Sequence, residues 1–354
     1  MADATNAKSA ASLATGELSK RERTRRALAR QPVDRLPTQV NYTGAMGRKL
    51  ASWFDVPVTE LESRLDNHLL RVDLAQPKTL TSGGKVALDW WGAGWSTETE
   101  GYWHASAPLA EGMDLDCYRW PDPHEPTLLQ EAAQAITADA QQRFVVANFG
   151  FALFERAWSL RGFDALLVDM MDRPAWVEEL LERITEIQIA LARRFVAMGV
   201  DAGYFGDDYG AQESLLFSPR IWRQFYRPRL ARMFAVFRQA ELPVILHSDG
   251  DIRAFLPDLV DIGVSALNPV QPEVLNHSWL RQQYGNQLAF YGGISTQQVL
   301  PRGNDSEIRA AVETCVHDLA PEGTGLLLGP SHRLQSDISA ESVEAMLRAF
   351  RRIA

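Results

Sequence analysis

The segment Leu242-Pro243-Val244-Ile245-Leu246-His247-Ser248-Asp249-Gly250-Asp251 decides the fold that we predict for this chain. It is an aliphatic run that stops at a histidine, and Gly325-Leu326-Leu327-Leu328-Gly329-Pro330-Ser331-His332 repeats this pattern later. A strand that is buried on both faces has such a continuous apolar sequence, and in parallel α/β proteins the ligand site lies where these strands end. The two segments therefore predict a parallel sheet with chemically active side chains at the carboxyl ends of its strands.

Strands and helices alternate along much of the chain. Beside the strand at Val244, we predict strands that include Leu36, Val145, Val200, Val264, Leu288 and Thr324. A long helical region over 165–198 breaks near Pro174, where proline fits a helix start. Recurrent β and α units with short connections are typical of a parallel sheet covered by helices. We count seven strands, and we expect an eighth within the tryptophan-rich segment 80–126 or the helical region to complete a (β/α)8 TIM barrel.

Three segments fall outside this alternation. Residues 1–19 are rich in Ala, Ser and Thr and lack the apolar core of a secretory signal, so we predict a disordered tail. Residues 20–30 have the mixed charge of a solvent-exposed helix. The segment 80–126 holds five of the ten tryptophans and predicts hairpins and loops on a barrel face, whose rings pack or, as the alternative, line a pocket. We therefore expect one barrel domain over 20–354, with an N-terminal extension and an aromatic-rich insertion.

The composition narrows the partners and the compartment. With 46% hydrophobic and 23% charged residues and no long apolar run, the chain is typical of a soluble globular protein rather than a membrane protein. Its net charge of -9 comes from scattered acids, which argues against nucleic acid as a partner. Cys117 and Cys315 are far apart and lack metal-type spacing, which favours a reducing compartment. We expect a cytoplasmic protein with a small-molecule substrate, and we consider a homodimer as its assembly.

Histidines and carboxylates at the predicted strand ends indicate a metal site, because all strand ends of a barrel share one mouth. Two imidazoles and one carboxylate can bind a divalent cation and leave positions open, so we predict that His247, Asp249 and His332 bind Zn2+ or Fe2+. If they do, the rings of His247 and His332 should lie within about 8 Å of each other. Of the adjacent Asp207 and Asp208, only one can face the pocket, and we choose Asp208 as a further ligand or general base. The alternative is that these histidines only form hydrogen bonds.

Further site residues are assigned by their position at strand ends. We place Tyr204 and Tyr291 with Asp208 in the catalytic group. The predicted substrate-binding residues are Tyr42, Trp95, Asn148, Asp207, Glu213, Asn268 and Gln271. The remaining histidines, His68, His104, His124, His277 and His317, are predicted to be structural or exposed. The sequence contains no P-loop, nucleophile elbow or Gly-x-Gly-x-x-Gly motif.

From Gly203 onward, the sequence resembles the uroporphyrinogen decarboxylase superfamily. The segments that carry the resemblance are Gly206-Asp207-Asp208, Ser218-Pro219, His247-Ser248-Asp249-Gly250-Asp251, Gly263-Val264, Leu267-Asn268-Pro269-Val270-Gln271-Pro272, Tyr291-Gly292-Gly293-Ile294-Ser295-Thr296-Gln297 and Gly329-Pro330-Ser331-His332. They follow one another in order over nearly half of the chain. The resemblance implies a (β/α)8 barrel with two functional branches.

The two branches differ in their use of a metal. One contains metal-free decarboxylases that hold a tetrapyrrole's propionates with an N-terminal arginine cluster, but residues 41–48 lack its Met-Arg-Gln-Ala-Gly-Arg signature. The other contains zinc methyltransferases that move a methyl group between a corrinoid protein and a thiol, and bind the metal with a His-x-Cys pair and a later Cys. His247 matches this histidine, Asp249 stands at the first cysteine, and His332 lies near the second. Exchange of both thiolates for harder ligands implies a more Lewis-acidic metal.

Three functions follow as hypotheses. The first is a metal-dependent methyltransferase-like enzyme with Zn2+ or Fe2+, for which a corrinoid carried by a partner protein is the methyl carrier. The second is a metal-free decarboxylase that acts on a small acid or a tetrapyrrole-like substrate, with Asp208 stabilising positive charge. The third is a non-catalytic corrinoid or tetrapyrrole binder that uses the rings between Trp90 and Trp103 as its contact surface.

Overall fold

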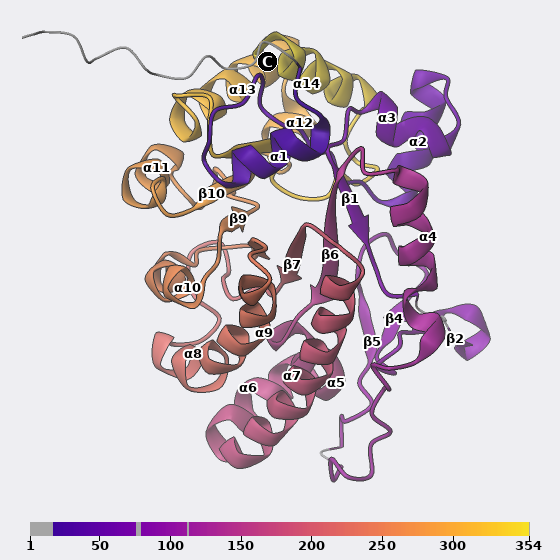
Figure 1. The fold of residues 1–354 in the computed structure, drawn as a ribbon. Helices are drawn as coiled ribbons and strands as arrows, with labels where there is room; N and C mark the ends of the chain where they lie inside the picture. Colours follow the sequence, from indigo (N-terminus) through magenta and orange to yellow (C-terminus); the bar gives the residue numbers. More distant parts are fainter. Residues whose placement is uncertain (1–16, 76–78, 112, 354) are drawn as a thin grey trace, which may run out of the picture.

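A parallel sheet of seven strands curls around the centre of the protein (Figure 1). The computed structural model describes residues 17–75, 79–111 and 113–353. The strands follow the order β1-β6-β7-β8-β9-β10-β11, and every neighbouring pair is parallel. They are β1 (Leu69–Val72), β6 (Phe144–Phe151), β7 (Ala202–Gly206), β8 (Val244–His247), β9 (Ala266–Asn268), β10 (Ala289–Ile294) and β11 (Leu326–Pro330).

Residues 37–40 occupy the eighth position, between the two edges of this sheet. The Gln39 N–H donates to the carbonyl of Leu328 in β11 at 2.9 Å, and the His68 N–H, just before β1, donates to the carbonyl of Thr38 at 3.0 Å. The segment therefore bridges β11 to β1, where the sequence predicts the first strand. The fold is a (β/α)8-like barrel, as predicted.

The location that we expected for the missing strand is wrong. β1 lies in neither the tryptophan-rich segment nor the helical region, but between residues 69 and 72. It is four residues long and has Arg71 inside it, so no apolar run marks it in the sequence. The tryptophan-rich segment instead contributes to a separate antiparallel sheet, which agrees with the predicted hairpins. Its strands are β2 (Thr79–Thr81), β3 (Val86–Leu88), β4 (Gly94–Ser96) and β5 (His104–Ser106).

Helices alternate with the strands of the barrel and cover its outer surface (Figure 1). The α-helices are α1 (Lys20–Leu28), α2 (Gly44–Phe54), α3 (Leu61–Arg64), α4 (Gln130–Asp139), α5 (Phe154–Arg161), α6 (Phe163–Asp172), α7 (Pro174–Ala197), α8 (Pro219–Phe225), α9 (Arg227–Gln239), α10 (Leu256–Ile262), α11 (His277–Tyr284), α12 (Val299–Arg302), α13 (Asp305–Leu319) and α14 (Ala340–Ile353). Short 3-10 helices are Val58–Glu60, Ser82–Gly84, Pro126–Leu129 and Arg253–Phe255. The break predicted near Pro174 separates α6 from α7. Within the described residues, no helix has both the length and the apolar character that crossing a membrane requires.

Helix α1 closes the amino-terminal end of the barrel. Leu28 belongs to the same buried cluster as Leu69 and Phe144, which face the barrel interior. Arg23 is 1% exposed and pairs with Asp34 at 2.7 Å. One face of this helix is therefore buried, which corrects the prediction of a solvent-exposed helix. Of the predicted tail 1–19, only the last three residues lie within the described part of the chain, and there Ser19 caps α1.

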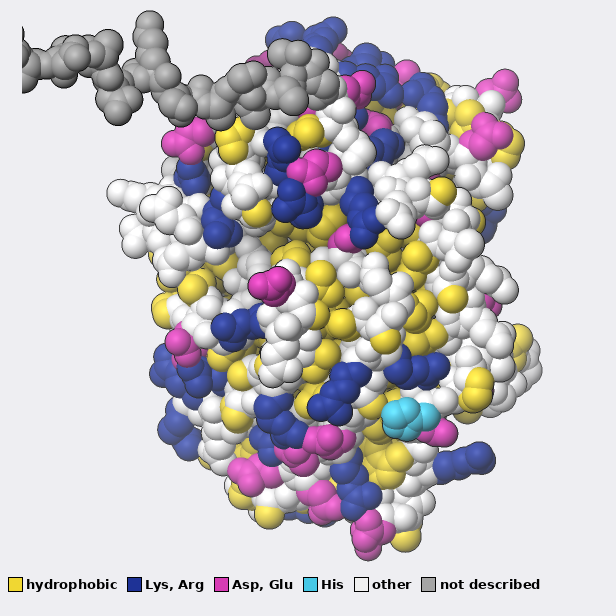
Figure 2. Space-filling view, viewed as in Figure 1, with side chains coloured by type: hydrophobic (Ala, Val, Ile, Leu, Met, Phe, Trp, Pro, Cys, Tyr) yellow, Lys and Arg dark blue, Asp and Glu magenta, His cyan; other side chains and the backbone are white. Residues whose placement is uncertain are grey.

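Side chains on the barrel strands alternate between two separate cores. The inner core contains Leu69, Phe144, Val146, Ala202, Tyr204, Ile245, Ala266, Ala289, Tyr291 and Leu327. Their neighbours in sequence, such as Val145, Phe205, Leu246 and Phe290, pack outward against the helices. Successive strand residues point to opposite faces, so the next inward positions toward the carboxyl ends are Arg71, Asn148, His247 and Asn268. On the face drawn in Figure 2, acidic and basic side chains are interspersed, and the described residues seen there form no broad basic patch.

Leu28→Ala tests the barrel floor. Leu28 is 3% exposed, and its truncation should leave a cavity that lowers the free energy of unfolding by about 2–5 kcal/mol. Leu80 is 62% exposed, and Leu80→Ala makes the same chemical change with an expected effect within about 0.5 kcal/mol. Urea unfolding of both variants measures the difference. Equal free energies for the two variants would contradict a packed floor.

Candidate functional site

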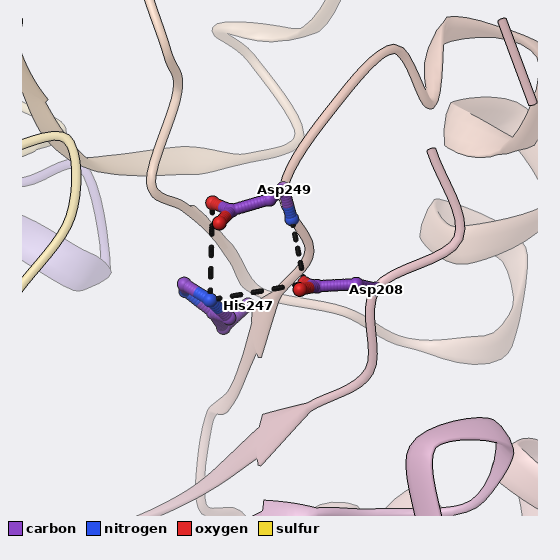
Figure 3. Close-up of side chains that lie close together, drawn as sticks. All are labelled: Asp208, His247 and Asp249. Carbon is purple, nitrogen blue, oxygen red and sulfur yellow. Dashed lines mark hydrogen bonds and ion pairs between the residues drawn. The ribbon is translucent and has the colours of Figure 1, made fainter. Parts of the chain in front are cut away.

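Three predicted site residues meet at the carboxyl ends of β7 and β8 (Figure 3). His247 Nε2 lies 3.8 Å from Asp208 Oδ1 and 3.9 Å from Asp249 Oδ1. One ligand atom from each of the three residues lies within 4.8 Å of the others. We call Asp208, His247 and Asp249 the acidic triad.

Asn268 fixes the orientation of the His247 ring. The Asn268 amide Nδ2 donates to the backbone carbonyl of Tyr291 at 3.0 Å, so its Oδ1 faces His247 Nδ1 at 2.7 Å. The same oxygen accepts the hydroxyl of Tyr204 at 2.7 Å. Because this oxygen can only accept, His247 Nδ1 carries the proton of the neutral ring, and its Nε2 lone pair points at the two carboxylates. Asn268, which we predicted to bind substrate, thus positions His247.

The triad contains an unsatisfied buried atom. Asp249 Oδ1 is buried and has no hydrogen-bond partner among the described residues. It is also the oxygen that faces His247 Nε2. A carboxylate oxygen without a donor beside an imidazole lone pair is costly in a buried site, and a cation between them would satisfy both.

His332 lies at the rim of the same site. Its ring centroid is 6.4 Å from that of His247, within the limit set for a shared metal, and its Nε2 is 3.8 Å from Asp249 Oδ2. Its Nδ1 contacts the carbonyl of Arg333 at 3.1 Å, which leaves the Nε2 lone pair of the neutral ring on the side of Asp249. The structure therefore brings all three predicted ligands and Asp208 together.

The loops after β7 and β8 interlock, and this contact sets the distance between Asp208 and Asp249. The Asp249 N–H donates to Asp208 Oδ1 at 2.8 Å, and the Gly250 N–H donates to Gln271 Oε1 at 2.7 Å. Gly250 has φ +80, and a Cβ there would lie 2.3 Å from the carbonyl carbon of Gly210. Only glycine fits this crossing. Gln271, a predicted substrate-binding residue, is buried and holds this loop.

Further carboxyl groups lie around the triad. Burial raises the pKa of Asp208 above its usual value. Burial and then the carboxylates of Asp208 and Asp207 raise the pKa of Glu155 well above its usual range. Glu155 lies in the first turn of α5 and was not predicted, because no motif sets it apart in the sequence. An excess of buried carboxylates is the electrostatic environment that favours a cation.

Two tyrosines and an arginine line the inner wall below the triad. The ring centroid of Tyr204 is 6.1 Å from that of His247, and the Arg71 guanidinium carbon is 4.4 Å from the Tyr204 centroid. Tyr291 accepts a hydrogen bond from Asn41 Nδ2 at 2.7 Å. Burial raises the pKa of Tyr291 to about 12, so its hydroxyl stays protonated at neutral pH. Arg71 is a candidate site residue that the sequence prediction lacked, because its strand was not recognised.

The carboxylate of Asp207 has a structural role, which corrects its assignment to substrate binding. It accepts the backbone N–H groups of Phe154 at 3.0 Å and Glu155 at 2.7 Å, and thereby caps α5. The Tyr209 hydroxyl donates to it as well, and Asp207 is fully buried. Burial raises its pKa to about 6. Only Asp208 faces the triad, as the alternation of side chains predicts.

Other predicted substrate-binding residues have contacts outside the triad. The hydroxyl of Tyr42 donates to Glu62, and Glu213 is exposed in the loop after β7. Trp95 packs among Tyr102, His104, Phe151 and Trp158, with ring centroids 5.1–6.1 Å apart. Trp95 therefore packs against other rings, which is one of the two roles expected for the rings of its segment. Asn148 lies at an inward position and contacts Asp73.

The donors of the site fit a borderline or hard divalent cation. Two carboxylates and one or two imidazoles are ligands that both zinc and iron accept. The orphaned Asp249 oxygen and the outward Nε2 of His247 face the same point. Asn268 behind His247 is the kind of partner that orients metal-binding histidines.

Comparisons with known proteins agree with this architecture. The curated uroporphyrinogen decarboxylase of Methylococcus capsulatus is 26% identical over 195 residues, which is 54% of this chain and 53% of that protein. The matched part thus spans about half the length of that relative. A solved structure of a methyltransferase from Methanosarcina mazei superposes with a TM-score of 0.73 at 19% identity, over 95% of this chain and 99% of that one. At this identity, the match shows the shared fold.

The family model described as uroporphyrinogen decarboxylase (URO-D) matches residues 92–353. This range includes the triad, Asn268 and His332, and six of the seven strands of the large sheet. It agrees with the resemblance in the sequence from Gly203 onward and extends it toward the N-terminus. The chain belongs to the uroporphyrinogen decarboxylase family.

Proposed function

We propose that this protein is a metal-dependent enzyme that transfers a methyl group to a small acceptor molecule. The observation that carries the proposal is the convergence of His247 Nε2 with the carboxylates of Asp208 and Asp249. The relative with the same fold is named a methyltransferase, which is the reaction class that we propose here. The methyl carrier in this proposal is a corrinoid, presented by a partner protein at the barrel mouth.

In this proposal, the acidic triad holds Zn2+ or Fe2+, and His332 completes the ligand set from the rim. When bound, the cation would act as a Lewis acid that favours the deprotonated acceptor. Asn268 keeps His247 in the tautomer that offers Nε2. Tyr204 and Tyr291 form the wall against which the acceptor lies.

The transfer itself requires few groups from the protein. The acceptor loses a proton to solvent, and its lone pair attacks the methyl carbon. The bond between that carbon and the carrier breaks, and its electron pair stays on the carrier. The role of the barrel is to hold the acceptor with its nucleophilic atom toward the mouth, which lowers the entropic part of the barrier.

The half-buried Asp208 supports a second candidate, metal-free decarboxylation of a small acid. Because burial raises the pKa of Asp208, a protonated form is accessible that can deliver a proton to the carbon that loses carbon dioxide. This candidate predicts release of carbon dioxide that persists after treatment with chelators. The curated relative is named a decarboxylase, which agrees with this alternative.

The first prediction for the site concerns metal content. Protein purified without added ions should contain about one equivalent of zinc or iron, and His247→Ala should lower it severalfold or more because a first ligand is lost. His124 is exposed, so His124→Ala should leave the content unchanged. Elemental analysis by mass spectrometry measures all three proteins. A trace amount that is the same in wild type and His247→Ala would refute metal binding.

A second prediction tests the role of Asn268. Asn268→Leu removes the acceptor that fixes the His247 tautomer, so metal affinity should fall by about 10–100-fold. Asn286 is exposed, and Asn286→Leu is the matched control, expected to keep the wild-type affinity. Competition with a coloured chelator measures both. Unchanged affinity in Asn268→Leu, with intact folding, would show that Asn268 does not orient a ligand.

A third prediction concerns the reaction. With methylcobalamin and a panel of thiols, the metal-loaded protein should remove the methyl group, seen as a change in corrinoid absorbance. Asp208→Asn should lower the rate by about 100-fold or more, because a charged ligand is lost. Carbon dioxide release that survives chelators, without demethylation, would support the decarboxylase instead. A cobalamin complex without any turnover would indicate a binder.

A further inference from the structure

Arg71 is half-buried inside the barrel, and among the described residues it lacks the carboxylate partner that the less exposed Arg23 and Arg156 have. Arg23, Arg156 and Arg161 each have a carboxylate oxygen at 2.7 Å. Among the described residues, no carboxylate lies within the 4.0 Å ion-pair distance of Arg71. A guanidinium inside a barrel costs desolvation energy unless an anion satisfies it.

The surroundings of Arg71 fix its direction. β1 points the side chain inward, directly above Leu69, which belongs to the apolar interior. Its guanidinium carbon lies 4.4 Å from the centroid of the Tyr204 ring. The Arg71 side chain is partly exposed, and the floor below it is closed by Leu28. An anion can therefore reach the guanidinium only from the barrel mouth, where the triad lies.

A second donor faces the same space. The Tyr291 hydroxyl oxygen already accepts the amide of Asn41, so its own proton is free for another acceptor. Asn41 is itself oriented by Gln39, whose Nε2 donates to Asn41 Oδ1 at 3.1 Å. Tyr291 belongs to the same inner cluster as Tyr204, whose ring the Arg71 guanidinium contacts. The pair offers one positive charge and one neutral O–H.

We propose that Arg71 and Tyr291 bind the carboxylate of a small monocarboxylic substrate whose other end reaches the acidic triad. The inference deepens the proposed function and rests on it for the identity of the reacting end. Arg71 lies before residue 92, outside the part of the chain that the family model matches. It is thus a feature that the family match does not supply.

The local charges favour a monoanion. A carboxylate matches the planar guanidinium with two parallel hydrogen bonds. Asp73 follows Arg71 by two residues without forming an ion pair with it, and Asp208 and Asp249 lie with His247 at the ends of β7 and β8. One guanidinium among these acids compensates a single negative charge, so a dianion such as phosphate is disfavoured.

The distances also limit the size of the substrate. The Tyr204 ring stands between the two sites, 4.4 Å from the Arg71 guanidinium carbon and 6.1 Å from the His247 ring centroid. A short chain of atoms that runs along this ring can place a carboxylate at Arg71 and a nucleophilic atom at the triad. A thiol acid such as 3-mercaptopropionate has this form.

The test uses metal-free protein, so that its outcome does not depend on the metal. The probes are acetate, propionate and 3-mercaptopropionate, the amide of each acid as a neutral control, and inorganic phosphate. Titrations followed by nuclear magnetic resonance compare wild type with Arg71→Gln and Arg71→Lys. Arg48 is exposed, and Arg48→Gln is the matched control for loss of a positive charge.

We expect at least one acid to bind wild type and Arg48→Gln with similar affinity. Arg71→Gln should weaken its binding by about tenfold or more. Arg71→Lys should weaken it less, because lysine keeps the positive charge and loses only the two parallel N–H donors of the guanidinium. Equal binding to wild type and Arg71→Gln, equal binding of acid and amide, tighter binding of phosphate, or no binding of any acid would each overturn the inference. If Arg71→Gln fails to fold, the acid and amide pairs on wild type and the Arg71→Lys variant still decide it.

The outcomes separate this inference from the proposed function. Acid binding at Arg71 in a protein that takes up no metal would refute the metal-dependent reaction and keep the carboxylate site. Stoichiometric metal without any acid binding would support metal binding and refute the carboxylate site.

Discussion

The hydrogen bond between His247 Nδ1 and Asn268 Oδ1 is the interaction on which the candidate site depends. It is 2.7 Å long, and the second hydrogen bond of Asn268, to the Tyr291 carbonyl, prevents the amide from turning over. Because Nδ1 donates its proton to Asn268, the neutral ring presents its Nε2 lone pair to Asp208 and Asp249. A lone pair and two carboxylates that face one another favour a cation at this point, and this arrangement is the basis of the proposed metal site.

The barrel makes this contact possible by its simple alternation of side chains. His247 and Asn268 lie at inward positions of neighbouring strands, paired in register. The same alternation places apolar residues at the previous inward positions, Ile245 and Ala266. An apolar layer therefore lies directly below the polar side chains. Each hydrogen bond in this layer is therefore shielded from water on one side, which strengthens it and increases the cost of leaving a group unpaired.

Much of this arrangement could be predicted from the sequence, because it depends on local patterns. An aliphatic run that stops at a histidine indicates a strand end, and alternation distinguishes Asp208 from Asp207. What could not be predicted depends on contacts between distant segments. Asp207 caps α5 through Phe154 and Glu155, about fifty residues earlier in the chain, and no local pattern shows this.

β1 shows a different limit. Its inner face ends in Arg71, so the strand lacks the apolar run that identifies its neighbours. An inward polar residue near the end of a barrel strand weakens the strand pattern at the same position where it adds to the site. The residues most informative about chemistry are therefore the ones that make a short strand hardest to recognise. In the same way, buried Arg23 gives α1 the sequence of an exposed helix, although it closes the barrel floor.

The mouth is divided by charge, and Tyr204 is the boundary. Its hydroxyl donates a hydrogen bond to Asn268, which orients His247, and its ring contacts the Arg71 guanidinium. One residue thus connects the side that is rich in carboxylates to Arg71, which forms no ion pair within the part of the chain that the structure describes. A polarised molecule with a negative end and a metal-seeking end would complement both sides at once, which neither a neutral ligand nor a simple ion does.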